Sequence, residues 1–495
     1  MNSSIIRYVL GNVLKIEACL FLLPCLTALI YREQEGYVYI FVAVITALIG
    51  CVMTIRKPKN NVFYLKEGCV TTALSWVFLS VFGALPFVLT GEIPSFTDAL
   101  FETISGFTTT GASILSDVEA LSYTSLMWRS FTHWIGGMGV LVFLLAIIPM
   151  TGGSHMNLMR AESPGPSVGK LVPKVKSTAQ ILYAIYLALT IIEIVLLLLG
   201  DMPAFDAITT SFGTAGTGGF GIKNDSLTSY SPYIQWVVTI FMILFGVNFN
   251  AYYLMLFGQL KKALCIEEVR CYILIILASI GIITLETLSM VGNGFKALTD
   301  ASFQVASIIT TTGFSTVDFN MWPMTCKTIL VLLMFIGACA GSTGGGIKVS
   351  RFIILVKTIA RELNYYIHPK STKKIKMDGK MIEHEIVRST NVYFITFMIV
   401  FCASVFAISF EGKDLVTNFT AVAATINNIG PGLELVGPTQ NFGLFCPASK
   451  YVLMFDMLAG RLELFPLLIL FHPTIWHDLY VQKSIQKKRK MTTAK

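Results

Sequence analysis

The sequence predicts an all-α polytopic membrane protein. Ten transmembrane helices are expected: two at the N-terminus, then four pseudo-symmetric helix–pore-loop–helix repeats. Of the 495 residues, 54% are hydrophobic and 13% are charged, about half the charged share of soluble domains. Ten apolar runs can each cross a bilayer, and a short pattern ending in glycine recurs four times. This composition excludes a soluble enzyme, a disordered protein and a nucleic-acid-binding protein.

The ten apolar runs set the expected course of the chain through the lipid bilayer. They lie at residues 8–31, 37–55, 69–90, 126–149, 179–200, 232–257, 271–292, 327–359, 391–410 and 450–471. The first run lacks a small-residue cleavage site, so it is interpreted as a span and not as a signal peptide. With the N-terminus inside, most of the 37 Lys and Arg residues fall in cytoplasmic segments, as the positive-inside rule requires. Both termini are therefore expected in the cytoplasm.

The same runs divide the chain into seven segments. Residues 1–66 hold the two N-terminal helices, and the four repeats occupy 67–165, 166–265, 266–366 and 391–480. Residues 367–390 form a basic cytoplasmic loop, and residues 481–495 form a basic tail. The run from Lys370 to Lys380 is interpreted first as a solvated loop and second as a docking site for a soluble partner.

Four outside segments between span pairs are too short and too polar to cross the membrane. They are DALFETISGFTTTG (98–111), DAITTSFGTAGTGG (206–219), DASFQVASIITTTG (300–313) and TNFTAVAATINNIG (417–430). Each suits a re-entrant half-helix that ends at a glycine turn. Their first residues are expected to cap the half-helices: Asp98, Asp206, Asp300 and Thr417. The span after each turn carries a further glycine: Gly136, Gly246, Gly337 and Gly460.

Irregular backbone at membrane depth occurs where it lines a water-filled path or is buried in protein. Four such turns around one axis would form a constriction lined by backbone carbonyls, which replace the hydration shell of a monovalent cation. Glycine allows the backbone conformation that aims a carbonyl inward, and the half-helix C-termini add partial negative charge. Nearby hydroxyl and amide oxygens come from Thr108–Thr110, Thr310–Thr312 and Asn427–Asn428. Such hard oxygen ligands suit alkali cations.

Six motifs together resemble the Trk/Ktr/HKT superfamily of potassium transporters, and within it the TrkH-type membrane subunit. They are FTTTGAS (107–113), GTGGFG (216–221), TTTGFST (310–316), NNIGPGLE (427–434), GACAGSTGGGIKVSR (337–351) and AGRLELFP (459–466). The resemblance covers essentially the whole chain. It implies a pseudo-four-fold pore for potassium, without an organic cofactor in this chain.

The resemblance also implies the cation-binding residues. These are Thr109, Thr110, Gly111, Thr217, Gly218, Gly219, Thr311, Thr312, Gly313, Asn428, Ile429 and Gly430. Glycine at the filter position of all four repeats is the pattern associated with potassium preference. The second repeat departs from the family pattern because Gly216-Thr217-Gly218 replaces a threonine-rich run. Whether side-chain oxygens contribute there is left open.

A glycine-rich stretch interrupts the span at 327–359. Five glycines lie between Gly337 and Gly346, and each would destabilise a helix by about 1 kcal/mol, so the span is expected to break. The alternative, a glycine face for close helix packing, would need glycines four residues apart, whereas three of these are contiguous. The resemblance implies that the stretch is an intramembrane gating loop, with the gating residues Gly341, Ser342, Thr343, Gly344, Gly345 and Gly346.

Arg461 is interpreted as the only arginine deep inside a span. A charge at that depth usually faces a cavity or a partner. Asp456 and Glu463 lie five and two residues away, off the spacing that pairs side chains on one helix. A pore-facing arginine that holds the gating loop through its carbonyls is therefore favoured over a structural ion pair.

Other ionisable residues have plainer interpretations. His133 is read as a packed core residue before a proton-coupling site, and Glu17 and Glu193 as packing residues before proton carriers. Three acidic residues near the outer mouth either concentrate cations or are merely solvated: Asp117, Glu119 and Glu434.

The predicted function is potassium uptake across a bacterial inner membrane. The family resemblance implies a homodimer regulated by a cytosolic, nucleotide-binding TrkA-type subunit, and this chain itself has no nucleotide motif. Alternatives are a channel-like subunit of an ATP-driven pump, or a sodium- or proton-coupled symporter with broken helices. An intramembrane enzyme is disfavoured because the polar residues form no converging catalytic set, and no nucleic-acid partner is expected.

Overall fold

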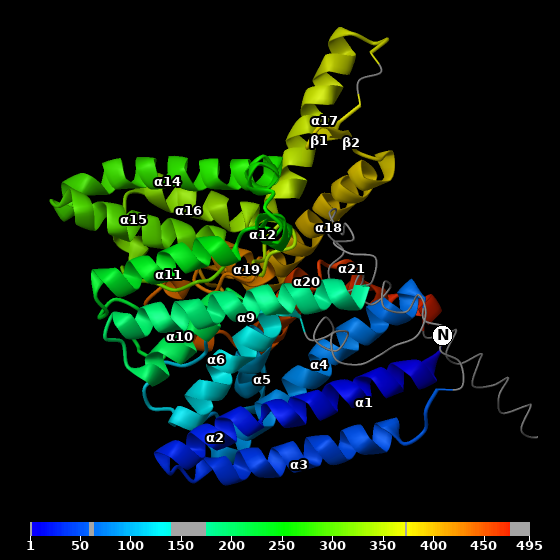
Figure 1. Cartoon of the computed structure of the whole chain (residues 1–495), viewed down its shortest axis with the longest axis vertical. Coiled ribbons are helices and arrows are strands. Elements are labelled where there is room, and N and C mark those ends of the chain that lie inside the picture. Colours follow the sequence, from blue (N-terminus) through cyan, green and yellow to red (C-terminus); the bar gives the residue numbers. More distant parts are fainter. Residues whose placement is uncertain (1, 59–63, 140–174, 372–373, 476–495) are drawn as a thin grey trace, which may run out of the picture.

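The computed structural model describes residues 2–58, 64–139, 175–371 and 374–475. The expected span at 126–149 is therefore described only up to residue 139, and the expected basic tail lies outside the described residues. In the described part, α1 (Ser3–Leu20) and α2 (Leu22–Tyr31) together correspond to the first expected span. α3 (Glu35–Thr54) returns beside α1, as Figure 1 shows along its lower edge.

Four similar units follow, each with a long helix, a short re-entrant helix and a second helix. They are α4 (Leu65–Thr90), α5 (Phe96–Phe107) and α6 (Tyr123–Met138); α9 (Val175–Leu199), α10 (Ala204–Gly216) and α11 (Pro232–Phe245); α14 (Glu267–Val291), α15 (Gly294–Ile309) and α16 (Met324–Ile336); and α18 (His384–Ser409), α19 (Leu415–Ile426) and α20 (Pro447–Arg461). This arrangement confirms the all-α fold with four repeats.

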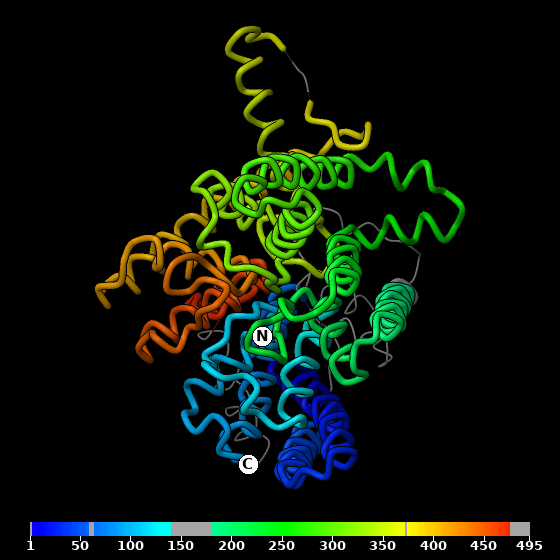
Figure 2. The backbone as a smooth tube through the Cα atoms, turned by 90° about the vertical axis from the view of Figure 1, so that its left-hand side faces the viewer, coloured from blue at the N-terminus to red at the C-terminus, as the bar shows by residue number. Residues whose placement is uncertain are grey.

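The four units close into a ring. Each re-entrant helix packs between the two helices of its own unit, and the second helix of each unit also packs on the re-entrant helix of the next. The pairs between units are α6 with α10, α11 with α15, α16 with α19, and α20 with α5. Figure 2, which views the helices end-on, shows cyan, green, yellow-green and orange-red segments succeeding one another around a centre.

Further elements connect these units. They are α12 (Phe249–Leu256), α13 (Leu260–Leu264), α17 (Val349–Ile367), the strands β1 (Lys376–Met377) and β2 (Lys380–Met381), α21 (Phe465–Leu468), and the 3₁₀ turns η1 (Phe319–Met321), η2 (Glu434–Val436), η3 (Phe442–Leu444) and η4 (Ile469–Phe471). β1 and β2 pair antiparallel in a short hairpin. α17 and this hairpin project from the helical body at the top of Figure 1.

The re-entrant helices begin earlier than the sequence predicted. The N-cap residues are Ser95, Pro203, Asn293 and Asp414, so the expected caps at Asp98, Asp206, Asp300 and Thr417 are wrong. The Asp414 carboxylate accepts a hydrogen bond from the Thr417 amide at 2.8 Å. Asn293 accepts from the amides of Phe295 and Lys296. An equally good capping residue therefore stands three to seven positions upstream in three repeats.

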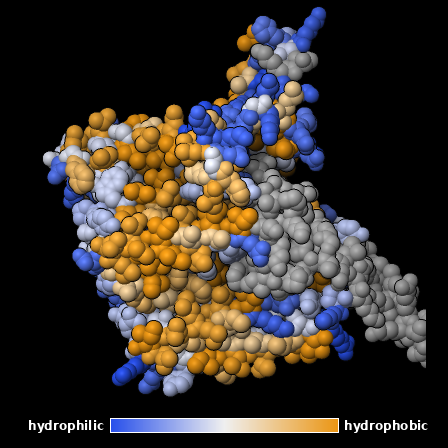
Figure 3. All heavy atoms as spheres, viewed as in Figure 1, coloured by the Kyte–Doolittle hydropathy of each residue, from blue (hydrophilic) through white to orange (hydrophobic). Residues whose placement is uncertain are grey.

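Nine of the ten expected spans coincide with a described helix or helix pair, and the span at 126–149 coincides with α6 as far as the described residues reach. Within the described residues, six helices are long and apolar enough to cross a membrane, and a seventh crossing results if α11 and α12, bent by 92°, form one span. The chain is thus a multi-pass membrane protein, while the count of ten stays a prediction. Figure 3 shows apolar side chains covering the helical body and hydrophilic ones on the projection formed by α17 and the hairpin.

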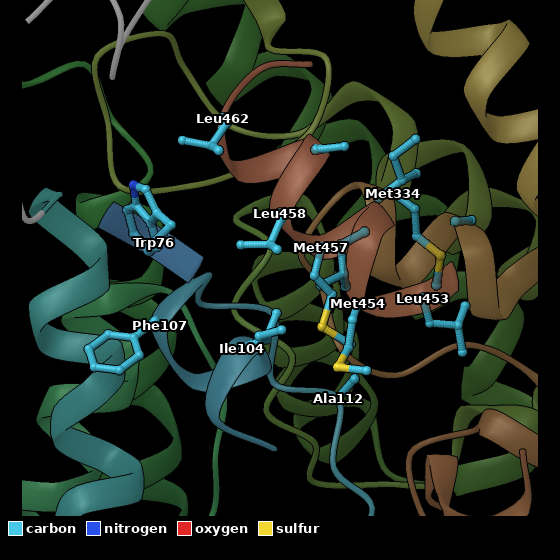
Figure 4. Close-up of a cluster of buried hydrophobic side chains, with 14 of the residues drawn as sticks. Trp76, Ile104, Phe107, Ala112, Met334, Leu453, Met454, Met457, Leu458 and Leu462 are labelled. Carbon is cyan, nitrogen blue, oxygen red and sulfur yellow. The ribbon is translucent and has the colours of Figure 1, made fainter. Parts of the chain in front are cut away.

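The second helix of each unit ends at or within two residues of its expected glycine. α11 ends at Gly246 and α16 at Gly337, each as the C-cap residue. The span at 327–359 breaks between residues 336 and 349, as predicted. In the interior, Met454 and Met457 of α20 lie between Ile104 of α5 and Met334 of α16 (Figure 4).

Candidate functional site

All four re-entrant helices end in the same backbone motif. A residue with left-handed backbone follows the last helical residue of each one. It is the second residue after α5, α15 and α19, namely Thr109 (φ 54°), Thr311 (59°) and Asn428 (56°), and the first residue after α10, namely Thr217 (55°). The next amide then bonds back five residues: Thr110 to Ser105 O (2.8 Å), Gly218 to Gly213 O (2.8 Å), Thr312 to Ser307 O (2.9 Å) and Ile429 to Ala424 O (2.8 Å). This is the Schellman ending of a helix.

The left-handed position carries a threonine in three of the four turns. Glycine or asparagine is the usual residue there, and a non-glycine residue in this conformation costs about 1–3 kcal/mol, a strain that clusters at ligand clamps and other functional sites. Only Asn428 follows the local preference. Three of the four turns therefore retain a strained residue, and the hydroxyls of Thr109 and Thr311 accept hydrogen bonds from Arg461 and from the amide of Gly345.

The glycine that ends each turn also has positive φ: Gly111 (76°), Gly219 (75°), Gly313 (88°) and Gly430 (98°). A Cβ on Gly111 would overlap the carbonyl oxygen of Gly218, one on Gly219 that of Thr312, and one on Gly313 that of Ile429. The cycle closes at Gly430, whose Cβ would lie 2.8 Å from the carbonyl oxygen of Thr110. The four predicted filter segments thus meet in cyclic order, backbone against backbone, where no side chain fits.

A cavity of about 130 Å³ opens onto this ring. All four turn glycines line it, together with polar residues of the segments that follow them, including Ser113, Asn224 and Asn441. Asn224 bonds to the side chains of both Asp117 and Glu119, which ties these two acidic residues to the rim of the mouth. Glu434 lies on an exposed turn and donates its amide to Asn320.

Side-chain oxygens in the turns are mostly bonded to one another. The hydroxyls of Thr108 and Thr110 are 2.8 Å apart, and those of Thr310 and Thr312 are 2.7 Å apart. Thr110 also accepts from the Asn428 amide at 2.9 Å, which links the first and fourth turns. In the second turn the Thr217 hydroxyl donates to the carbonyl of Gly216 at 2.6 Å.

His133 of α6 occupies the space that a threonine side chain would need in the second turn. A Cβ on Gly216 or Gly218 would overlap the backbone or the ring of this histidine. Its Nδ1 is 2.8 Å from the carbonyl of Gly106, and its Nε2 accepts from the Phe220 amide at 3.3 Å. These partners assign the proton to Nδ1 of a neutral ring. His133 is a buried residue, as predicted, and it also braces the second turn.

A buried ion pair that the sequence analysis missed lies behind the first and second turns. Arg129 Nε is 2.6 Å from Glu102 Oε1, and both side chains are almost fully buried. Glu102 accepts from Ser113 and Ile114 after the first turn, and Arg129 donates to Gly221 O after the second. The sequence did contain a signal for this pair, since Glu102 and Arg129 are opposite charges within apolar segments. Charged residues are rarely buried unless they are paired.

The break in the third unit forms a loop at residues 337–348 packed against the turns. Its two ends are bonded together, from the Ile347 amide to Phe335 O and from the Val349 amide to Ala338 O. The Gly345 amide donates to the Thr311 hydroxyl at 2.6 Å. A Cβ on Gly344 would lie 2.8 Å from Thr310 O. The loop thus lies directly against the end of α15.

The same loop also contacts the second unit. The amide of Cys339 donates to Gly246 O at 3.1 Å, and the Phe249 amide donates to Gly341 O at 3.0 Å. The Thr343 hydroxyl donates to Phe245 O at 3.2 Å. The loop therefore packs into the break between α11 and α12.

Arg461, the last residue of α20, joins the loop to the first unit. Its Nη1 donates to Thr343 O at 3.0 Å and to the Thr109 hydroxyl at 3.3 Å. Its Nη2 donates to the carbonyls of Gly136 and Gly137 at the end of α6. Arg461 and the loop together connect elements of all four units beside the turns.

Arg461 is only half-buried, and two other arginines within the expected spans are buried more deeply. Arg129 and Arg351 are 3% and 5% exposed. Arg351 pairs with Glu463, and its guanidinium carbon lies 4.0 Å from the centre of the Tyr393 ring. The Asp456 carboxylate accepts from Ser404 at 2.7 Å. Glu17 and Glu193 are both fully buried.

Comparison with known proteins identifies the family. The family model TrkH, described as a cation transport protein, matches residues 37–482. The chain belongs to the TrkH family. It is 37% identical to the Trk system potassium uptake protein TrkH of Salmonella typhimurium over 487 residues, which cover 97% of this chain and 100% of that protein. It is 32% identical to the Trk system potassium uptake protein TrkG of Escherichia coli, with 97% and 100% covered.

A solved structure of the family has the same fold. The crystal structure of the potassium transporter TrkH from Vibrio parahaemolyticus matches with a TM-score of 0.86 at 33% identity, over 96% of this chain and 100% of that one. The family consists of cation transporters and not of enzymes, as predicted.

Proposed function

We propose that this chain conducts potassium into the cell through the ring of four glycine turns. The observation that carries the proposal is the cyclic contact of Gly111, Gly219, Gly313 and Gly430 with the carbonyls of neighbouring turns. Carbonyl oxygens in such a ring can replace the hydration shell of a potassium ion. The names of the relatives, potassium uptake proteins of the Trk system, support the choice of ion.

The proposed cation-binding residues are the twelve predicted from the motifs, with unequal roles. The carbonyls of residues 110, 218, 312 and 429 are the main ligands, because each lies against the next turn glycine. The hydroxyls of Thr110 and Thr312 are bonded to neighbouring hydroxyls, so they support the turns. The Thr217 hydroxyl, bonded to its own backbone, contributes no ligand in this conformation.

The loop at 341–346 and Arg461 are the proposed gate. A guanidinium beside the turns opposes cations by charge, and its bonds to Thr343 O and to the first unit fix the loop across the path. The conformation described here would then be closed. Opening requires the loop to leave Thr310 and Thr311 and Arg461 to release Thr343.

The wider assignments remain proposals with family support. We place the chain in the bacterial inner membrane with both termini inside, as a homodimer regulated by a cytosolic TrkA-type subunit. The names of the relatives place them in a Trk system, which supports the proposal of a partner. With this topology we also propose the division of the chain into seven segments, from the two N-terminal helices at residues 1–66 to the basic tail at 481–495.

Ion flux through liposomes that contain only this chain tests the proposal. We expect potassium to move down its gradient faster than sodium, without ATP, and faster still in the Arg461→Ala variant. The absence of flux for both cations in wild type and in Arg461→Ala would reject a pore. Flux that stops when a proton or sodium gradient is collapsed would favour a symporter over a channel-like mechanism.

A further inference from the structure

Glu268, near the start of α14, is a buried carboxylate that the proposed pathway does not use. It is 2% exposed. Its Oε1 accepts from the amide of Ala340 at 2.6 Å and from that of Ser350 at 3.1 Å, and its Oε2 accepts from the Asn248 side chain at 3.3 Å. One carboxylate therefore holds the loop, the first turn of α17 and the break between α11 and α12.

These bonds meet a local need of the backbone. α17 starts after Lys348, which has a left-handed φ of 81° and makes no side-chain cap. The amides at a helix start need an acceptor, and a negative charge is favourable there. Glu268 supplies both from another helix. Asn248, its other partner, also caps α12 through the amide of Asn250 at 2.9 Å.

The residue before it, Glu267, contacts the cytoplasmic hairpin. The Glu267 amide donates to the carboxylate of Asp378 at 2.7 Å, in the turn between β1 and β2. The Glu267 side chain pairs with Lys357 of α17 at 2.5 Å, and Lys357 donates to the carbonyl of Lys376 at 2.7 Å. The hairpin region is also packed against the helices, because Ile375 is buried with Ile354 of α17 and Val387 of α18.

We infer that Glu267 and Glu268 form a joint that couples the hairpin at 376–381 to the gating loop. Glu268 is a positioning residue that holds both ends of the loop in the closed conformation. A force on the hairpin shifts α14 and α17 through Glu267 and Lys357. The carboxylate of Glu268 then releases the backbone amides of Ala340 and Ser350. This inference rests on the proposed gating role of the loop.

The first test measures potassium flux through Glu268→Ala in liposomes. We expect flux to rise by on the order of tenfold, because two buried amides lose their acceptor in the closed conformation only. Selectivity for potassium over sodium should not change, since the turns are not touched. Glu385→Ala is the matched control, an exposed glutamate in the first turn of α18. Glu268→Gln, which keeps one acceptor oxygen, should fall between the two.

A labelling experiment separates loop movement from loss of folding. Cys339 lies in the loop and is fully buried, whereas Cys265 is exposed. A membrane-permeant maleimide, with labelling read by mass spectrometry, should modify Cys339 faster in Glu268→Ala than in wild type. Labelling of Cys265 should stay equal and serves as the internal standard. A rise in all buried cysteines together would indicate unfolding and would overturn the assignment.

A double-mutant comparison tests the coupling itself. Asp378→Ala should alter flux in wild type and have no further effect in Glu268→Ala, since the hairpin acts on the loop through this joint. Independent, multiplicative effects would reject the coupling. If Arg461→Ala raises flux and Glu268→Ala does not, the joint fails and the proposed gate stands. If neither variant nor wild type conducts potassium, the proposed function fails first.

Discussion

Replacing Gly344 by alanine tests whether the loop obstructs the pathway. The Gly344 backbone lies outside the left-handed region, so alanine adds a methyl group without backbone strain. That methyl would lie 2.5 Å from Ala338 Cβ and 2.8 Å from Thr310 O. Both distances are shorter than 3.4 Å, where ordinary van der Waals contact begins. Thr310 cannot easily retreat, because its amide and hydroxyl are both bonded to Ala306 O.

The loop must therefore give way. Overpacking by one methyl group costs about 1–3 kcal/mol, and the closed conformation alone bears this cost. A free-energy difference of that size changes the ratio of open to closed molecules about 5- to 150-fold. We expect potassium flux to rise by a factor within that range when the closed form predominates in wild type.

Potassium and sodium flux from liposomes would measure this effect. The matched control is Gly281→Ala in α14, where a Cβ would have no neighbour within 4 Å. Flux in Gly344→Ala no higher than in Gly281→Ala would refute the view that the loop closes the pathway. A loss of potassium over sodium discrimination would instead show that Thr310, and with it the third turn, had moved.

Three further predictions concern the ring, the arginine and a helix cap. Gly111→Ser should lower potassium over sodium discrimination, whereas Gly91→Ser should not, because Gly91 has a similar φ of 80° but open space around it; equal selectivity in both would remove Gly111 from the filter. Arg461→Ala should raise flux, and a folded but inactive variant would point to a structural role. Hydrogen bonds from Thr417 hold the pKa of Asp414 below its usual value. The stabilising contribution of the Asp414 carboxylate is therefore complete above the pKa of the unfolded state, near 4. This contribution is lost as the pH falls through the lower pKa of the folded state. Asp414→Ala should therefore destabilise the protein by about 1 kcal/mol at pH 7, with a difference in thermal midpoint that shrinks below pH 4; a constant difference would contradict the assignment of the cap.

Several features of the fold were predictable because they depend on local sequence. Apolar runs such as 69–90 must be long enough to cross a bilayer, and the four glycines had to mark turns because they fall at the ends of short helical segments. The glycines between Gly337 and Gly346 predicted the broken span by propensity alone. The helix starts were predicted less well, since Asp98 and Ser95 are both acceptable caps and only the packed helix selects one.

The charged contacts could not be predicted from spacing. Arg461 binds Thr343 and Thr109, which are 118 and 352 residues away, and Glu463 pairs with Arg351, which is 112 residues away. Glu268 has no distinguishing motif, and its role follows only from the two amides that face it. Such partners depend on how distant helices are packed, and this information is not contained in local periodicity.

The sequence by itself determined that this protein crosses the membrane repeatedly and contains four glycine turns and a broken helix. Hydropathy and the requirement for positive φ act within a few residues, so these features are readable along the chain. Only the tertiary structure decided that Gly111 meets Gly218, that Gly430 meets Thr110 to close the ring, and that His133 of α6 fills the space beside Gly216 and Gly218 in the second turn. Those contacts join separate repeats, and their order is fixed by how the helices pack around a common centre.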